Sequence, residues 1–371
     1  MHRRLKTAPA VLLASCPLAF VAPAAAQKVV APGVDSVRVR ANIQAQFNTT
    51  SANDEPGSEW QLRRARVGVA GYAAGWLHAY VEGDFGAGDA RLTDGYVTLE
   101  FDPRLEIRAG QFKVPFDEHE LISSRELLVI ERDPLPRGAM GFSPTGLLDG
   151  LGYNGRDIGI DWNGRFDRLH AAVGFFNGQG DNEEEADDGK QVAARIAGEI
   201  AEGWRVSGAW TGLRLSEPPV EDDAAWYHAL ELAVRAGEYA EPGLQLLGQL
   251  FYGDDYAPDL LGDEDASFIA WQGIVGYHIP TYETPYLIGW EPVVRLGWAR
   301  IEGGQVVDGG DAVLSLDDQE PSTTVLTAGI NLYWQERIRT QIQADLSSFD
   351  GNDALPDSND VALRIQLGFG F

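Results

Sequence analysis

The sequence predicts an all-β fold, a transmembrane antiparallel β-barrel of about 16 strands, from two observations. The carboxyl-terminal stretch Val361–Phe371 alternates apolar residues with polar or small ones, and it ends on an aromatic residue. Successive side chains of a strand point to opposite faces, so this strand has one apolar face. After the amino-terminal leader no apolar run reaches the length of a membrane helix. A chain without such helices can cross a membrane only as strands.

The amino-terminus predicts a secretory signal peptide over residues 1–26. Three basic residues among the first six precede an uncharged run that ends in Ala24-Ala25-Ala26. A positive head, an apolar middle and a small-residue cleavage site are the three parts of such a signal. Two alternatives stay open, because Leu13–Cys16 resembles a lipoprotein cleavage motif and the uncharged run is nearly long enough for a membrane anchor. We expect residues 27–371 to form a single domain, the barrel.

The charge balance excludes nucleic-acid binding, and the cysteine count excludes a disulfide bond in the exported protein. The chain has 29 basic and 56 acidic residues and a formal net charge of −27. Nucleic-acid binding needs a basic footprint and is therefore excluded. Cys16 is the only cysteine and lies in the leader, so the exported protein cannot form a disulfide bond and depends on its own packing and hydrogen bonding.

The predicted strands follow one another at short intervals, five before a long interruption and eleven after it, sixteen in all, give or take about two. They are Val37–Phe47, Trp60–Tyr72, Trp76–Phe85, Thr93–Phe101, Leu105–Ala109, Asp157–Trp162, Leu169–Phe176, Gln191–Ile200, Trp204–Leu213, Tyr227–Arg235, Leu244–Tyr252, Phe268–Ile279, Val293–Ile301, Thr323–Trp334, Arg337–Leu346 and Val361–Phe371. Short turns such as Asn163-Gly164 alternate with long acidic connections such as Gly178–Lys190. This alternation is typical of an outer-membrane barrel.

Aromatic residues distinguish a membrane barrel from a soluble sandwich, which could also end in an alternating strand. They lie at or near predicted strand ends, where the two membrane interfaces would need them. The set comprises Trp60, Tyr72, Trp76, Phe101, Trp204, Tyr252, Tyr333, Trp334 and Phe371. A sandwich core would more often place tryptophan in the middle of a strand. The apolar parity is therefore expected to face lipid.

The interruption, Asp117–Gly155, is a long segment in which no long strand is predicted. Pro115 cannot donate to a sheet ladder, and the strand rhythm stops there. Ser123-Ser-Arg-Glu126 has the form of a helix capping box, which predicts a short helix ending near Asp133, before Pro134. Loops of this length within a compact domain are uncommon and usually functional.

One internal stretch carries a specific family resemblance. Arg108-Ala-Gly-Gln-Phe-Lys-Val-Pro-Phe116, followed by Ser123–Glu126 and Ile130-Glu-Arg132, resembles the phosphate-selective porin O and P family of Gram-negative outer membranes, and so do Arg63–Val69 and Gly329–Trp334. The resemblance implies a sixteen-stranded, trimeric diffusion channel whose third external loop folds into the lumen. Residues 117–155 would then be the constriction loop.

Lysine content departs from this resemblance. Family members that prefer phosphate use lumenal arginines and a lysine cluster, whereas after the leader this chain has only Lys28, Lys113 and Lys190. The sequence therefore predicts a channel without predicting phosphate selectivity.

Strand parity identifies the arginines that should face the lumen: Arg38, Arg40, Arg64, Arg66, Arg108, Arg195, Arg205, Arg235, Arg295, Arg339 and Arg364. Closure places the last strand beside the first, so we expect Arg364, Arg38, Arg40, Arg64 and Arg66 to form one basic wall opposite acidic residues of the loop. The predicted pore-lining set is Arg38, Arg40, Arg64, Arg66, Arg108, Lys113, Glu120, Arg125, Glu126, Glu131, Arg132 and Arg364. The alternative is that each arginine pairs with a lumenal carboxylate such as Glu82, Glu106 or Asp345.

These features predict a passive channel for small hydrophilic solutes, anions such as phosphate among them, in the Gram-negative outer membrane. The expected partners are outer-membrane lipid, lipopolysaccharide and two further copies of the chain, with no cofactor and no metal. Scattered histidines and the Ser123–His119 neighbourhood give no basis for an enzyme. Acidic runs such as Asp181–Glu185 lack the spacing of a calcium loop and are expected to be solvated. An adhesive or structural barrel that uses these acidic loops is the alternative.

Overall fold

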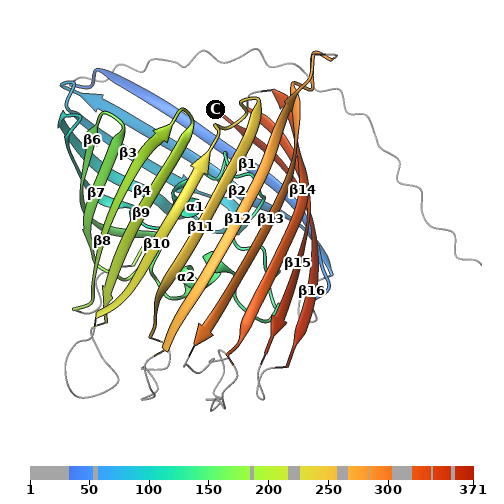
Figure 1. The fold of residues 1–371 in the computed structure, drawn as a ribbon. Coiled ribbons are helices and arrows are strands. Elements are labelled where there is room, and N and C mark those ends of the chain that lie inside the picture. Colours follow the sequence, from blue (N-terminus) through green and yellow to red (C-terminus); the bar gives the residue numbers. More distant parts are fainter. Residues whose placement is uncertain are drawn as a thin grey trace, which may run out of the picture.

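The computed structural model describes residues 33–371 except 53–56, 184–187, 216–225, 257–265, 283, 303–319, 336 and 352–355. In this part of the chain, sixteen antiparallel strands close into one barrel (Figure 1). They are β1 (Ser36–Thr50), β2 (Ser58–Ala73), β3 (Leu77–Asp84), β4 (Arg91–Asp102), β5 (Leu105–Lys113), β6 (Arg156–Phe166), β7 (Leu169–Phe176), β8 (Lys190–Ala201), β9 (Trp204–Arg214), β10 (Trp226–Ala236), β11 (Gly243–Asp255), β12 (Ala266–Pro280), β13 (Gly289–Glu302), β14 (Ser322–Gln335), β15 (Ile338–Asp350) and β16 (Ser358–Gly370). The predicted fold class and strand number are confirmed, while the predicted signal peptide lies outside the described residues.

The barrel closes between its first and last strands, as the closing-strand prediction requires. β16 pairs with β1, with Leu367 opposite Ala45 and Phe369 opposite Ile43. Beyond the strand, the backbone N–H of Phe371 donates to Ala41 O at 3.0 Å, and the N–H of Ala41 donates to Phe371 O at 3.0 Å. The backbone N–H and C=O of the terminal aromatic residue are thus both hydrogen-bonded to the first strand. No helix of the described residues is long and apolar enough to cross a membrane.

Removing Phe371 is expected to lower the fraction of assembled barrel in the outer membrane, because two closing backbone hydrogen bonds and an interfacial aromatic side chain are lost together. Heat-dependent mobility of the outer-membrane fraction on gels measures this. Phe371→Tyr is the control, since it keeps the backbone and an aromatic ring, and it should assemble like the wild type. Equal assembly of the truncated chain would contradict the role of this residue in closure.

The apolar parity faces outward. Val361, Leu363, Ile365 and Leu367 are exposed on the barrel surface, whereas Arg364 between them is buried inside. Most of the predicted interfacial aromatics are exposed as well, among them Trp60, Trp76, Phe101, Trp204, Tyr252, Trp334 and Phe371. For Tyr72 and Tyr333 the prediction was wrong. Tyr333 is fully buried and donates to Glu291 Oε2 at 2.8 Å, and Tyr72 lies under the guanidinium of Arg38.

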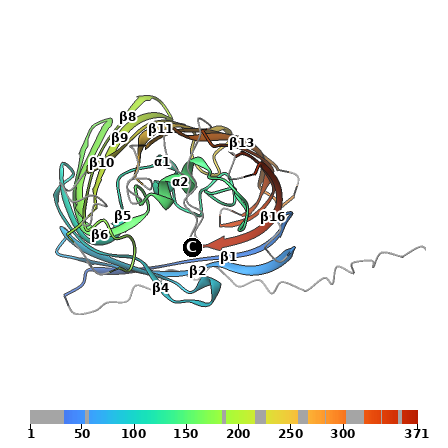
Figure 2. The ribbon, with the colours of Figure 1, turned by 90° about the horizontal axis from the view of Figure 1, so that it is seen from below.

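Residues 114–155 connect β5 to β6 and lie inside the ring of strands, where Figure 2 shows the two short helices α1 (Glu118–Leu121) and α2 (Pro144–Gly150). The helix predicted from Ser123 to Asp133 is absent. The wall strands occupy backbone groups that a helix would use, since Arg339 donates to Leu127 O at 2.8 Å and Gln343 Oε1 accepts from Ile130 N at 2.8 Å. A third short element, the 3₁₀ turn η1 (Gly86–Gly88), lies between β3 and β4.

An apolar core holds residues 114–155, which we call the inner segment, against one side of the barrel. Phe116, Leu148 and Tyr153 of this segment are buried against inward-facing rings of the wall, including Phe251 and Phe268. Burying side chains of this size stabilises the contact by about 1.5–3 kcal/mol each relative to exposure. The segment therefore packs on the β7–β13 side of the interior, and its charged face is left toward β1–β6.

Candidate functional site

Two carboxylates of the inner segment each contact two arginines of the wall. Glu118 pairs with Arg195, a short buried contact, and lies 3.7 Å from Arg235. Glu131 receives Arg63 Nε at 2.7 Å and lies 3.8 Å from Arg64. Because paired buried charges strongly resist losing one partner, these contacts position the segment within the lumen.

A second group of contacts lies at the start of the segment. Glu120 Oε2 is 2.9 Å from Arg132 Nε, and Glu120 Oε1 is 3.4 Å from Lys113 Nζ. Both bases also donate to backbone carbonyls, with Arg132 reaching His119 O at 3.1 Å and Ile122 O at 2.6 Å. Lys113 additionally contacts Glu120 O. The run Gly-Gln-Phe-Lys thus ends in a lysine that anchors the first turn of the inner segment.

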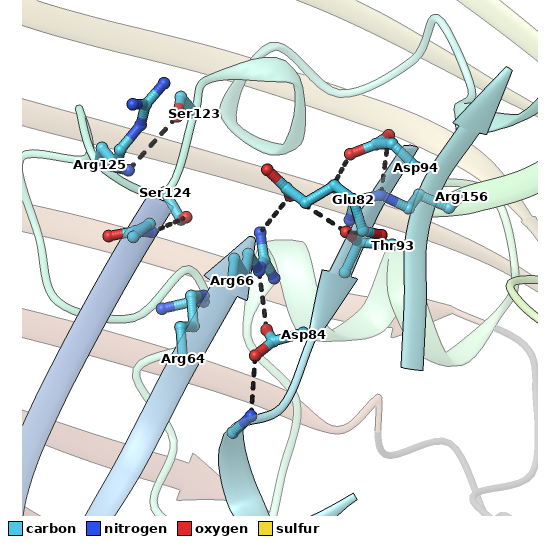
Figure 3. A network of polar contacts seen from close by, with 12 residues as sticks. Arg64, Arg66, Glu82, Asp84, Thr93, Asp94, Ser123, Ser124, Arg125 and Arg156 are labelled. Atoms are coloured by element: carbon cyan, nitrogen blue, oxygen red, sulfur yellow. Dashed lines mark hydrogen bonds and ion pairs between the residues drawn. The ribbon is translucent and has the colours of Figure 1, made fainter. Parts of the chain in front are cut away.

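The wall opposite these groups carries alternating charge (Figure 3). Arg66 on β2 donates to Asp84 Oδ2 at 2.7 Å and lies 3.9 Å from Glu82 Oε1. Arg156 at the start of β6 makes a two-pronged contact with Asp94 at 3.2 and 3.1 Å. Thr93, the neighbour of Asp94 in the sequence, donates from Oγ1 to Glu82 Oε1 at 3.0 Å. Such charge-assisted and bidentate bonds fix side chains in place.

These side chains form one charge cluster, which we call the loop–wall cluster. Its bases are Arg40, Arg63, Arg64, Arg66, Lys113, Arg132 and Arg156, and its acids are Glu82, Asp84, Asp94, Glu120 and Glu131. The cluster is continuous across the gap between segment and wall, since Arg66 and Arg156 both lower the pKa of Arg132, after the larger effect of its burial. Seven bases against five acids leave two positive charges.

Apart from Arg364, the predicted pore residues outside the cluster lie toward the short-turn end of the lumen. Arg38 is exposed and lies 4.9 Å from the ring of Tyr72. Arg40, which belongs to the cluster, is also exposed and lies 5.8 Å from the ring of Tyr80, whose hydroxyl donates to Glu82 Oε2 at 2.7 Å. Arg108 pairs with Asp161 at 2.5 Å. Arg125 and Glu126 are half-buried, and their side chains have no hydrogen bond or ion pair within the described residues.

The single basic wall does not form. Arg364 lies opposite Asn48, eight residues along β1 from Arg40, which is about 27 Å. It pairs with Asp345 and donates to Pro134 O at 3.0 Å, so it supports the inner segment. The alternative of pairing with lumenal carboxylates holds for Arg66 with Glu82 and for Arg364 with Asp345, whereas Glu106 is paired with Arg165 at 3.7 Å.

Parity also missed one contributor. The register passes from Gln44–Arg64 to Ala45–Leu62, so Arg63 is the extra residue of a β-bulge and its guanidinium reaches Glu131 on the inside. The three charges within the four residues Arg63-Arg64-Ala65-Arg66 contradict strict alternation and are the only sequence signal of this bulge. Arg156 was missed because it immediately follows the predicted interruption.

Two cavities flank the cluster. One of ≈ 420 Å³ lies toward the long loops and is lined by Asn48, Glu59, Arg63, Glu131 and Arg364, among others. Another of ≈ 560 Å³ lies toward the short turns, where Arg165, Arg168, Arg205 and Arg235 contribute basic side chains. The cluster thus lies between an outer and an inner vestibule, the second of which is rich in arginine.

Acid should not release the inner segment until well below neutral pH. Burial raises the pKa of Glu131, but Arg63 and Arg64 outweigh it and lower the pKa from 4.5 to about 2. The pairing therefore stabilises the docked segment above pH 4.5 and is lost as the pH falls toward about 2. Burial raises the pKa of Asp117, so its protonation in acid does not weaken the first turn.

Single-channel conductance should stay constant from neutral pH to the unperturbed glutamate pKa and change only below it, and Glu131→Gln should show the acid behaviour at neutral pH. A change that begins near pH 6 would contradict this ordering.

The comparisons with known proteins agree with this architecture. A family model described as phosphate-selective porin O and P matches residues 37–236. No curated protein matches the chain. Among solved structures, the chain is similar to the outer membrane channel DcaP of Acinetobacter baumannii, with 13% identity over 92% of this chain and 98% of that chain and a TM-score of 0.62. It is also similar to an anion-selective porin from Comamonas acidovorans, with 15% identity, coverage of 91% and 99% and a TM-score of 0.59.

A third similar structure is OmpT of Vibrio cholerae in its trimer form, with 12% identity, coverage of 91% and 99% and a TM-score of 0.58. At these identities the three structures show a shared porin fold. The family model spans more than half of the chain, from the first strand of the barrel to the tenth. The chain therefore belongs to the phosphate-selective porin O and P family, whose members are channels of the Gram-negative outer membrane and not enzymes.

Proposed function

We propose that residues 114–155 narrow the lumen and that solutes pass this narrow section beside the side chains of the loop–wall cluster. The observation that carries this proposal is the small excess of positive charge in the cluster. Charges at a narrow, partly desolvated section act strongly on a passing ion, whereas charges on solvated loops are screened beyond about 8–10 Å. The channel accordingly admits small hydrophilic solutes with a weak preference for anions, despite a net charge of −27.

A weak preference fits the cluster better than phosphate selectivity does. Most of its guanidinium groups already pair with carboxylates, as Arg66 does with Asp84 and Arg156 with Asp94. A selective phosphate site would need several donors free of such partners, because phosphate binds through charge-assisted hydrogen bonds. A solved structure of similar fold is titled an anion-selective porin, which is consistent with anion entry in this chain.

Several remaining expectations belong to the same proposal. A related structure is a trimer, and we infer that this chain also assembles as a homotrimer. Outer-membrane lipid and lipopolysaccharide surround the barrel. Residues 1–26 are removed as a signal peptide, and the exported chain forms one domain.

Ion conductance in planar bilayers tests the proposed function directly. Purified wild-type protein should form open channels whose zero-current potential in a potassium chloride gradient indicates modest anion preference. Added phosphate should reduce the chloride current only slightly, since a tight phosphate site would block it. Absence of conductance would favour the adhesive or structural barrel, and strong block by phosphate would overturn the weak-preference proposal.

A further inference from the structure

An apolar groove crosses the outer face of the barrel from β7 to β11. Its volume is ≈ 610 Å³, and it is the largest of the spaces described here. The side chains that line it on the outer face form two rows across five strands: Val173, Ala194, Trp210, Leu230 and Tyr252 in one, and Ala171, Ile196, Gly208, Leu232 and Leu250 in the other. Strands lie about 4.8 Å apart, so the rows extend about 19 Å.

Small residues form the floor of the groove and large ones its sides. Ala194 and Gly208 leave space between the exposed side chains of Ile196, Leu230 and Leu232. In a chain that spans the outer membrane, this surface faces hydrocarbon. A concave apolar surface there favours contact with an apolar chain, because voids forfeit dispersion contacts and water finds no hydrogen-bond partners.

Two cations lie beside the groove on β8 and β9, on the side of the long loops. Lys190 on β8 is paired in register with Arg214 on β9, and Arg214 is paired with Trp226 on β10. Residues directly opposite in neighbouring strands share a face, and Trp226 is exposed, so all three lie on the outer face. Arg214 lies four residues beyond Trp210, about 13 Å along the strand and toward the long loops.

The row of the groove that lies nearer to the cations carries an aromatic belt. Trp210 stacks on His228 with ring centroids 5.7 Å apart, and Tyr252 is exposed one strand further on. Tryptophan and tyrosine mark the level of the membrane interface. Within the described strands β8 to β11 one acid shares this face, Asp254, whose carboxylate accepts from the backbone N–H of His228 at 2.7 Å. The vertical order is therefore apolar groove, aromatic belt and cations.

We propose that this surface is a site for lipopolysaccharide of the outer leaflet, with one acyl chain in the groove and a headgroup phosphate against Arg214 and Lys190. Both halves of the ligand are matched, the chain by the apolar lining of the groove and the phosphate by two cations at headgroup level. Lys190 Nζ already donates to Gly189 O at 2.7 Å. The proposed site therefore depends on the positive charge of Lys190, which can attract a phosphate while this hydrogen bond is kept.

Matched substitutions on two parts of the outer face test the site. Gly208→Leu fills the floor, and it fits locally because a Cβ there would lie 3.7 Å from Leu232, an ordinary contact. Gly273→Leu on β12 is its control, since nothing lies within 4 Å of a Cβ there. Arg214→Gln combined with Lys190→Gln removes the charge. Arg300→Gln is the control for this pair, because Arg300 lies on the outer face of β13 and is already paired with Glu302 and Glu320.

Retained lipopolysaccharide per protomer, measured by native mass spectrometry on protein extracted from outer membranes, is the readout. Gly208→Leu and the double charge variant should each lower it severalfold, while both controls keep the wild-type amount. Heat-dependent gel mobility identifies variants that fail to assemble, and Ala194→Leu then replaces Gly208→Leu. Equal retention in all variants overturns the proposal. Loss of trimers with unchanged retention also overturns it and assigns the groove to a protomer interface. Conductance should remain unchanged throughout, so this test is separate from that of channel function.

Discussion

Replacing Leu121–Pro134 by a short Gly-Ser bridge should raise the single-channel conductance severalfold. Barrels of 16 strands enclose an aqueous channel when nothing fills them, and here the inner segment occupies part of that space. The hydrogen-bonded ladder from β1 to β16 closes without the segment, so the barrel should persist. Conductance in planar bilayers measures the effect, and heat-dependent mobility shows whether the shortened chain assembles. An assembled variant with wild-type conductance would mean that the segment does not limit flow.

A cross-link provides the opposite perturbation. Gln44 Nε2 donates to Ser124 O at 3.1 Å, so Gln44→Cys with Ser124→Cys places two thiols on contacting residues. Oxidation should tether the segment to β1 and leave conductance unchanged, because the segment already lies there. Thr49→Cys with Ser124→Cys is the control pair, since Thr49 is five residues further along β1, about 17 Å away, and should not react. Equal reaction of both pairs would indicate that the segment does not occupy this position.

Reversing two charges of the loop–wall cluster should invert ion preference. Arg66→Glu with Arg156→Glu changes the cluster from two positive charges to two negative ones, and both side chains contact solvent, with 16% and 14% exposure. Arg64 is a poorer target because only 4% of its side chain is exposed. In a tenfold salt gradient each perfectly selective limit lies about 60 mV from zero. The zero-current potential should therefore move by several tens of millivolts toward cation preference.

Neutralising the acids of the connection that the sequence predicts to be external is the matched comparison. Asp181, Glu183, Glu184 and Glu185 change the total charge by as much as the arginine pair does. Two charges about 4 Å apart interact by about 4 kcal/mol at an effective dielectric of 20 but by about 1 kcal/mol in bulk water. The loop variant should thus shift the potential far less. A larger shift from the loop variant would reverse the assignment, and no shift from the arginine pair would place the permeation path elsewhere.

The sequence by itself determined the barrel, because a strand shows its two faces locally. Alternation in Val361–Phe371 predicted which side chains face lipid, and the same period of two placed Arg64, Arg66, Arg295 and Arg364 on the inside. Turn length and interfacial aromatics supplied the rest. The aromatic prediction failed for two rings, Tyr333, which donates to the buried carboxylate of Glu291, and Tyr72, which lies under the guanidinium of Arg38.

Only the tertiary structure decided which charges meet. Partners such as Glu131 and Arg63 lie 68 residues apart, and their contact depends on a bulge and on the path of the inner segment. That path follows from the apolar core around Phe116 and Tyr153 and from wall side chains that replace the hydrogen bonds of the predicted helix. Closure register likewise separates Arg364 from Arg40 along β1, although both lie on the inner face. Local periodicity cannot encode such contacts, because they arise from the register of strands distant in sequence and from side chains that compete for the same backbone groups.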